Sequence, residues 1–492
     1  MRTFTFVALL LTLFQCYGKT QIGLQKHQAS KNRKHDLLSQ TESNVSKLPL
    51  VASSPASNDV YKGVACIIGG FLAHLTYGSL YCWGNFLSYS PPQLRFFDGQ
   101  EHPNQPDALQ VMPITLLAQC LTMPLGPLLV KRLGPQKTQL IGSVLVALGV
   151  YLASFTKTLR DFLAFYSVLF GAGVGLAYTA PMTAAWNYMP DKKGLVSGVI
   201  LTGFGGGGFI FNLIGTKLVN PKNLEALLGK FPEEVYSNFP NMLRKLASLY
   251  LTFSLVGSLL IIEKKDIKLV SAPTVNQSGG KGGSSATALS GPSGVGVIQA
   301  LQTKQFWMLW FMVITSASAG LNVASVYKQF ASTSPNLTGD SFQSLVGGLG
   351  ALFNALGRLF WGNLSDTIGF KKSFIILTVM QSALHFLFPK STVSKQAFAA
   401  VTCLCYFCLA GNFALMPPAV QRLFGSRNGT LIYGLLYSAF ATAAVGGMQV
   451  AKALNVALGW EKSFQSLAAV SLIATLITSF VFPISSYTES TI

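Results

Sequence analysis

Charged residues are scarce in this sequence, and acidic ones are the scarcest. Only 11% of the 492 residues are charged, whereas 50% are hydrophobic. A soluble domain usually carries about 25% charged residues, because its outer atoms must meet water. Lipid removes that requirement, so the composition argues against a soluble protein and predicts one that lies in a bilayer.

Acidic residues number 17 against 36 lysines and arginines, which gives a net charge of +19. Such an excess is typical of nucleic-acid-binding proteins, but here the basic residues stand in short links between apolar runs. Anionic lipid headgroups attract basic residues in that position. We therefore expect a lipid bilayer, and not a nucleic acid, beside these residues.

Patterns that hold metals or carry out catalysis are also missing. Cys403, Cys405 and Cys408 lie in an apolar run with no histidine beside them, so we interpret them as packing residues. The glycine-rich run 203–208 lacks the Lys-Ser/Thr that follows a phosphate-binding loop. No nucleophile stands at a spacing that pairs it with a base. The sequence predicts no metal, no cofactor and no enzymatic activity.

Long apolar runs, in contrast, are abundant. A membrane-spanning helix needs about 20 mostly apolar residues. A window of that length predicts 62–88, 108–130, 138–156, 162–181, 194–216 and 246–262, and then 305–328, 342–364, 373–388, 397–420, 429–454 and 463–483. We therefore predict an all-α membrane protein with twelve transmembrane helices in two six-helix bundles.

A polar segment separates the two sets of spans. Residues 263–304 begin with charges and continue as a run rich in glycine and serine, which is typical of a flexible linker. We divide the chain into a first half at 59–262, a second half at 305–483 and a tail at 484–492. Most basic links fall on the side of this linker, which predicts that this side is cytosolic.

The first 58 residues leave two interpretations open. Residues 4–14 form an apolar run too short to span a bilayer, followed by the small residues Cys16 and Gly18, which resembles a secretory signal peptide. Residues 19–58 are rich in serine and basic residues, like a transit peptide. Together they resemble the bipartite leaders of secondary plastids. The other interpretation is an uncleaved basic tail, on a protein of another membrane such as the plasma membrane.

A charged motif follows the span 342–364. It runs from Gly362 to Lys372 as GNLSDTIGFKK, and a degenerate copy in the first half has Lys131 where the motif has Asp366. Glycines allow close helix approach, and a carboxylate can cap a neighbouring helix end. We predict a latch that breaks when the two halves rock, weaker in the first half. Its residues are Gly362, Asp366, Gly369, Lys371, Lys131 and Gly134.

Arg358 lies inside the span 342–364, about two turns before Asp366. A charge inside a bilayer is costly, so an ionisable residue there is by default a functional residue that faces the protein interior. Arginine offers a planar fork of donors that matches a carboxylate. We predict that Arg358 is the counter-charge for an anionic substrate. The alternative is a structural partner of Asp366 or a side chain that reaches the membrane surface.

Several segments, in order along the chain, resemble the oxalate/formate antiporters and monocarboxylate porters of the major facilitator superfamily. They are Gly171–Pro181, Trp186–Gly208, Asn354–Asp366 and Tyr433–Phe440, and the similarity covers roughly residues 60–483. The resemblance implies a major facilitator fold, a monomer, and movement of a small organic anion by alternating access. A counter-anion or a proton is the implied coupled species.

The sequence departs from this family pattern at two positions. The antiporters usually have a lysine in helix 11 where this sequence has Phe440, so one cation of the expected pair is missing. A single arginine suits a monocarboxylate such as pyruvate, lactate or formate. Proton-coupled porters usually have an aspartate where this sequence has Asn354. Proton coupling through a buried carboxylate is therefore not supported.

Further substrate-binding candidates stand in the spans that line the cavity in this family. They are His74, Tyr77, Tyr178, Asn322, Asn412 and Tyr437. His74 could also relay a proton, although a lone histidine on an apolar helix is more often a packing residue, as we expect for His385. Aromatic packing is the alternative for each tyrosine. A sugar or nucleoside carrier, or a receptor on the same scaffold, is the competing function.

Overall fold

The structure is a computed structural model, and it describes residues 57–101, 106–222, 224, 231–264, 295–331, 333–337 and 340–481. The predicted leader up to residue 56, the predicted linker at 265–294 and the predicted tail lie outside the described residues. All regular structure in the part of the chain that is described is helical.

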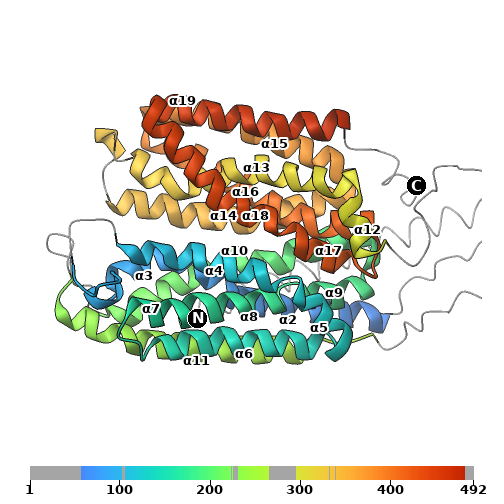
Figure 1. The fold of residues 1–492 in the computed structure, drawn as a ribbon, viewed down its shortest axis with the longest axis horizontal. Coiled ribbons are helices and arrows are strands. Elements are labelled where there is room, and N and C mark those ends of the chain that lie inside the picture. Colours follow the sequence, from blue (N-terminus) through green and yellow to red (C-terminus); the bar gives the residue numbers. More distant parts are fainter. Residues whose placement is uncertain are drawn as a thin grey trace, which may run out of the picture. The chain divides into compact units, whose positions relative to one another are not determined.

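The first half of the chain forms the lower layer of ribbons in Figure 1, drawn from blue to green. Its helices are α2 (Ser57–Tyr77), α3 (Trp83–Tyr89), α4 (Val111–Thr122), α5 (Leu125–Leu133), α6 (Pro135–Ala153), α7 (Leu159–Phe162), α8 (Phe170–Ala177), α9 (Ala180–Tyr188), α10 (Lys193–Val219) and α11 (Glu233–Leu259). Short turns such as η2 (Gly78–Cys82) and η5 (Leu163–Leu169) join pieces of one span.

The second half forms the upper layer, drawn from yellow to red. Its helices are α12 (Val297–Gln302), α13 (Lys304–Ala331), α14 (Asp340–Ile368), α15 (Phe370–Leu387), α16 (Lys395–Phe424), α17 (Gly429–Leu436), α18 (Ser438–Thr442) and α19 (Met448–Leu476). The short helix α12 occupies the end of the segment that the sequence assigns to the linker.

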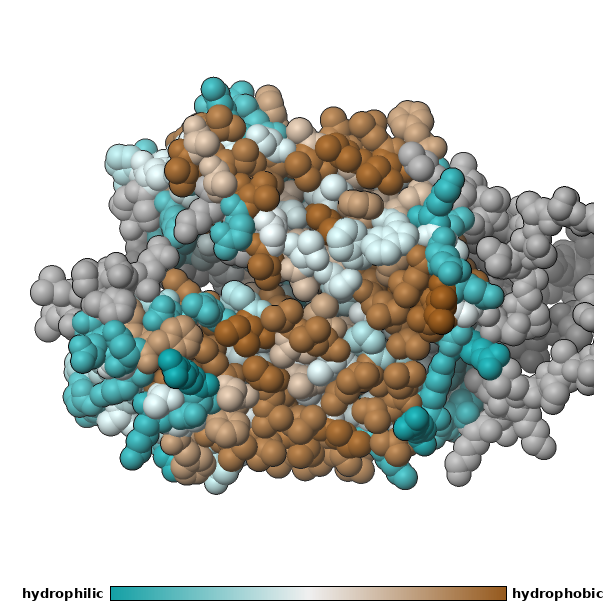
Figure 2. All heavy atoms as spheres, in the orientation of Figure 1, coloured by the Kyte–Doolittle hydropathy of each residue, from teal (hydrophilic) through white to brown (hydrophobic). Residues whose placement is uncertain are grey.

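Helical segments cover each of the twelve predicted spans within the described ranges. Eight of these helices are long and apolar enough to cross a membrane, or nine if the pair Asp107–Thr122 and Leu125–Leu133, bent by 49°, counts as one span. The helices α6, α11 and α14 are not among them. Apolar side chains form a band across the helices in Figure 2, and hydrophilic ones gather at both ends. The chain is an all-helical membrane protein.

The turns after α5 and α14 share one backbone conformation. Gly134 has φ 84° and ψ 163°, and Gly369 has φ 83° and ψ 161°. Only glycine adopts this region without strain. The two halves therefore keep the same turn, although the residue three positions earlier differs in charge. We call the end of the helices that carries these turns the linker side.

Helix α10 of the first half packs along α14 of the second half. A Cβ atom added to Gly194 would collide with the backbone of Gly362, and one on Gly362 with the backbone of Gly194. A Cβ on Gly198 would meet the backbone carbonyl of Arg358 at 2.6 Å. Small residues let helix backbones approach this closely. The contact brings the start of α10 to the Asp366 turn and its middle to Arg358.

Candidate functional site

Arg358 is buried in the middle of α14, with 1% of its surface exposed. Its Nε donates to Oδ1 of Asn354 at 3.2 Å, and its Nη1 donates to the backbone oxygen of Leu201 at 3.3 Å. Asn354 in turn donates to the backbone oxygen of Tyr406 at 3.0 Å, which fixes its amide. No carboxylate of the described residues forms an ion pair with Arg358. The predicted alternative, pairing with Asp366, is therefore not seen.

Two phenylalanine rings enclose the guanidinium. Its carbon lies 5.3 Å from the ring centre of Phe204 and 4.9 Å from that of Phe413. A desolvated cation–π contact contributes about 2 kcal/mol. Phe204 belongs to α10 and Phe413 to α16, so the cation is held between the two halves of the chain.

The position of the missing second cation is filled by an aromatic stack. Phe440 is buried and lies on Phe413, with ring centres 4.7 Å apart and planes at 15°. Phe440 also contacts the ring of Tyr437 at 5.1 Å. Phe440, at the position where the family resemblance implies a lysine, thus supports the ring that holds Arg358, and the local charge is that of one guanidinium.

His74 and Tyr178 join this cluster from the first half. The His74 ring lies 5.1 Å from Tyr178 and 6.3 Å from Phe204. Its Nδ1 is 2.9 Å from the backbone oxygen of Gly70, and the backbone of Tyr178 also interacts with the buried imidazole. Arg358 exerts an electrostatic influence on both His74 and Tyr178.

Tyr178 also approaches the second half of the chain. Its ring lies 5.8 Å from that of Tyr437. The Tyr437 hydroxyl accepts a hydrogen bond from Nε2 of Gln119 at 3.1 Å. The Oε1 of Gln119 is buried without a partner in the described part of the chain. Polar atoms of both halves therefore meet near the guanidinium with hydrogen-bonding capacity to spare.

The other three candidates lie apart from these contacts. Tyr77 is buried and its hydroxyl is hydrogen-bonded to Oγ of Ser143 at 2.8 Å, which ties it to α6 inside the first half. Asn412 is fully buried, and both polar atoms of its amide lack partners in the described residues. Asn322 is also buried, but no contact recorded within the described ranges brings it to Arg358.

Asp366 binds the first half from the second. Its carboxylate accepts hydrogen bonds from the backbone N–H groups of Gly194 at 3.0 Å and Leu195 at 2.7 Å, at the start of α10. It also pairs with Arg422 of α16 at 2.5 Å. A helix N-terminus carries unpaired N–H groups and partial positive charge, so it attracts a carboxylate. The contact closes the linker side between α10 and α14.

Lys131 makes the corresponding contact from the first half to the second. Its Nζ donates to Oδ1 of Asn428 at 2.9 Å, in an exposed position just before α17. Lys371, another residue of the predicted latch, lies partly buried at the start of α15. The two contacts are therefore unequal, one through a charged helix cap and one through a solvated side-chain contact.

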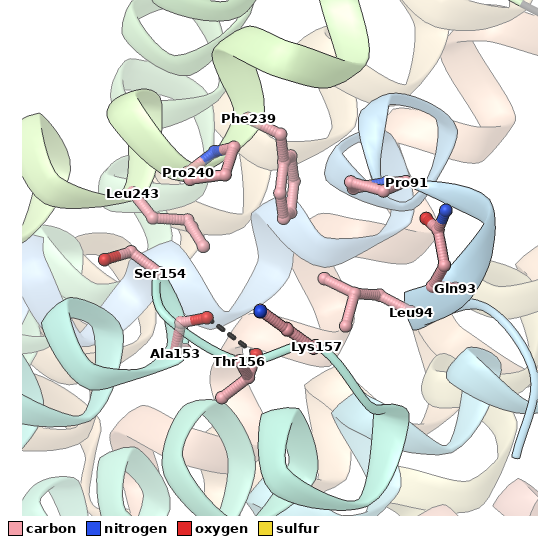
Figure 3. Close-up of a pocket in the computed structure, with 10 residues that line it drawn as sticks. All are labelled: Pro91, Gln93, Leu94, Ala153, Ser154, Thr156, Lys157, Phe239, Pro240 and Leu243. Atoms are coloured by element: carbon pink, nitrogen blue, oxygen red, sulfur yellow. Dashed lines mark hydrogen bonds between the residues drawn. The ribbon is translucent and has the colours of Figure 1, made fainter. Parts of the chain in front are cut away.

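Neither of two surface cavities in the described residues includes Arg358. One, of about 460 Å³, lies between the end of α10 and the start of α11. The other, of about 300 Å³, is shown in Figure 3, and its lining includes Lys157, Leu94 and Leu243. Arg358 itself is buried and lines neither of them.

Phe204, Phe413 and Gln119 were not predicted as site residues. An apolar ring in an apolar helix gives no signal in a sequence, and only the fold shows that two rings flank a cation. The one clue was that Phe204 interrupts the glycine-rich run 203–208, where a bulky residue stands out.

Comparisons with known proteins agree with this arrangement. The profile of the Major Facilitator Superfamily matches residues 4–225 and 296–491. Apicoplast pyruvate carrier 1 of Toxoplasma gondii is 26% identical over 86% of this chain and 89% of its own length. The oxalate:formate antiporter of Oxalobacter formigenes is 27% identical over 75% of this chain and 81% of its own length. The solved transporter FucP, in its outward conformation, has a TM-score of 0.59 at 16% identity, covering 85% of this chain and 99% of FucP.

Proposed function

Because the chain belongs to the Major Facilitator Superfamily, and is a multi-pass membrane transporter, we propose that it moves a small monocarboxylate by alternating access. The substrates that we favour are pyruvate, lactate and formate. The observation that carries this proposal is the buried guanidinium of Arg358, which has no carboxylate partner in the described residues. An unpaired charge in such surroundings is costly, and a bound carboxylate offsets that cost.

The charge of the site supports one carboxylate rather than two. Arg358 is flanked by Phe204 and Phe413, and Phe440 extends the stack. A second carboxylate would lie against apolar rings, where an unpaired anion is strongly disfavoured. A monocarboxylate leaves only its methyl or hydrogen there. The names of the two relatives, a pyruvate carrier and an oxalate:formate antiporter, agree with small carboxylates as a class.

Residues of both halves are available to the bound anion. Tyr178 of the first half and Tyr437 of the second lie 5.8 Å apart at their ring centres, and tyrosine hydroxyls donate hydrogen bonds to carboxylates. A substrate held by Arg358 and both tyrosines favours the closed state of the carrier. Release on the linker side then requires Asp366 to leave the start of α10.

Counterflow in proteoliposomes tests this function. Vesicles loaded with unlabelled substrate should take up labelled pyruvate, lactate or formate, and take up oxalate much more slowly. Arg358→Ala should lower the rate at least tenfold, which corresponds to about 1.4 kcal/mol. Arg244→Ala is the matched control, because Arg244 also lies over a ring, that of Phe155, but is exposed. Unchanged carboxylate exchange by Arg358→Ala, or exchange of sugars or nucleosides alone, would overturn the proposal.

We also propose that the transporter resides in a plastid membrane and that residues 1–58 direct it there. The basic, serine-rich composition of this segment supports the proposal, as does similarity along most of both chains to a carrier named for the apicoplast. Fluorescent fusions with and without residues 1–58 test it in a cell that has such a plastid. Fluorescence at the plasma membrane for the full-length fusion would contradict it.

A further inference from the structure

The cavity of about 460 Å³ lies at the end of the first half opposite the linker side, between the end of α10 and the start of α11. Its polar lining consists of two lysines, Lys217 and Lys245, which we call the cavity lysines, and two asparagines, Asn238 and Asn241. The rest of its lining is apolar. Because Arg358 is not part of it, this cavity is separate from the candidate substrate site.

The positive charge of this cavity is not balanced by a nearby ion pair. Neither cavity lysine pairs with a carboxylate of the described residues. The carboxylate of Glu234, in the first turn of α11, pairs with Lys222 at 2.7 Å instead. Asn238 donates from Nδ2 to the backbone oxygen of Val219 at 3.2 Å, which joins the two helix ends. The cavity therefore offers two unpaired ammonium groups on a braced wall, and its charge suits an anion.

Apolar side chains continue from the cavity along the outer surfaces of both helices. On α10, Leu213 and Phe209 stand about one and two turns before the cavity lysine, and Leu213 is 59% exposed. On α11, Val256 and Leu259 stand about three and four turns after the cavity lysine, and Leu259 is 76% exposed. Figure 2 shows the apolar band of the lower layer ending in hydrophilic residues at its left end. Each cavity lysine thus follows a surface that contacts lipid.

We propose that this cavity binds the phosphate headgroup of an anionic phospholipid, in the leaflet on the side opposite the linker. Ammonium groups attract phosphate oxygens, and basic pockets between transmembrane helices hold anionic headgroups in this way. The acyl chains of such a lipid lie on the apolar surfaces of α10 and α11. A soluble phosphate ion gains nothing from those surfaces, so the continuity of charge and apolar surface favours a lipid. Most basic links lie on the linker side, and these two lysines are exceptions that a bound headgroup explains.

Titration of the purified full-length chain in detergent, followed by native mass spectrometry, tests this site. Phosphatidylglycerol should bind about 25-fold more tightly than phosphatidylcholine with the same acyl chains, since each lysine beside an anionic headgroup contributes about fivefold. Lys217→Gln and Lys245→Gln should each weaken binding of phosphatidylglycerol by about fivefold, and the double variant should lose the preference. Lys157→Gln is the matched control, because Lys157 is an exposed lysine that lines the other cavity at the same end. It should leave the preference unchanged.

Glycerol 3-phosphate, which has the phosphate without acyl chains, separates a lipid from a soluble ion. In large excess it should not displace phosphatidylglycerol. Displacement would assign the cavity to a soluble phosphate and overturn the proposal. Equal affinity for the two lipids, or an equal loss in Lys157→Gln, would also overturn it, because the attraction would then not belong to this cavity. If the double variant does not fold, the two single variants decide, and no outcome depends on which substrate the protein carries.

Discussion

The two glycine turns on the linker side have the same backbone and opposite charges. Gly134 and Gly369 agree within 2° in both dihedral angles. Three residues before each glycine, the first half has Lys131 and the second has Asp366. The lysine reaches one exposed side chain, whereas the aspartate binds two backbone N–H groups and an arginine. The backbone conformation of the turn is the same in the two halves, but the charge three residues before the glycine is opposite.

Because of this difference, we expect one contact, that of Asp366, to contribute most of the stability of the closed linker side. A hydrogen bond to a charged group contributes about 1.5–3 kcal/mol, whereas an exposed side-chain contact contributes much less. We therefore expect opening of this side to depend mainly on the Asp366 cap at the start of α10. Substitutions in the two turns test how far backbone and charge act separately.

Exchanging the charge in the stronger latch should have the largest effect. Asp366→Lys would place a cation against the start of α10 and against Arg422. We expect it to destabilise the closed linker side by about 3 kcal/mol and to lower pyruvate counterflow more than tenfold. Lys372→Asp, on the exposed side of the same turn, is the control and should change the rate less than twofold. Wild-type exchange by Asp366→Lys would rule out the latch.

Replacing the glycines should have a smaller effect, and an equal one in the two halves. Gly369→Ala should lower the free energy of unfolding by about 2 kcal/mol, because a Cβ is strained at this φ. No atom of the described residues lies within 4 Å of the Cβ position at Gly369, and the Glu263 carboxylate, on a flexible side chain, lies 2.9 Å from that at Gly134. Thermal unfolding in detergent should therefore shift alike in both variants. A Gly134→Ala variant as stable as the wild type would show that the conformation is not needed.

Strengthening the weaker latch should have the smallest effect. Lys131→Asp would bring a carboxylate to the start of α17, where a helix N-terminus favours it. We expect a closed linker side that opens less often, and an exchange rate reduced by fivefold at most. Lys137→Asp, exposed in the same link, serves as the control. A faster rate in Lys131→Asp would mean that the lysine, and not the carboxylate, stabilises closure.

The apolar spans were predictable because lipid imposes length and composition, but their ends were not. Helix α11 begins at Glu233, thirteen residues before the predicted start at residue 246. Its first turns carry Glu233, Glu234 and Arg244, which an apolar window rejects, although a helix can extend beyond the bilayer. The end of the eleventh predicted span and most of the twelfth lie in one helix, α19, which has non-helical backbone at Gly459. A local glycine conformation of this kind is not encoded in hydropathy.

The sequence singled out the charged residues of the candidate site but not the rings around them. Arg358 and Asp366 stand out because a charge in an apolar setting needs a reason. Phe204 and Phe413 lie far along the chain from Arg358 and look like any other apolar residue. Tyr77 has the right chemistry, yet its hydroxyl turns to Ser143. Which face of a helix meets the other half depends on packing, which one sequence alone does not specify.

The glycines along α10 and α14 have a mechanical consequence. Where Gly194 meets Gly362, and Gly198 meets the backbone of Arg358, main chain touches main chain with no side chain between. At these contacts the two helices can tilt relative to each other without a change of side-chain rotamer. Between these glycine contacts, hydrogen bonds from Arg358 to Leu201 and from Thr202 to Ala355 join the two helices and must break before they can tilt.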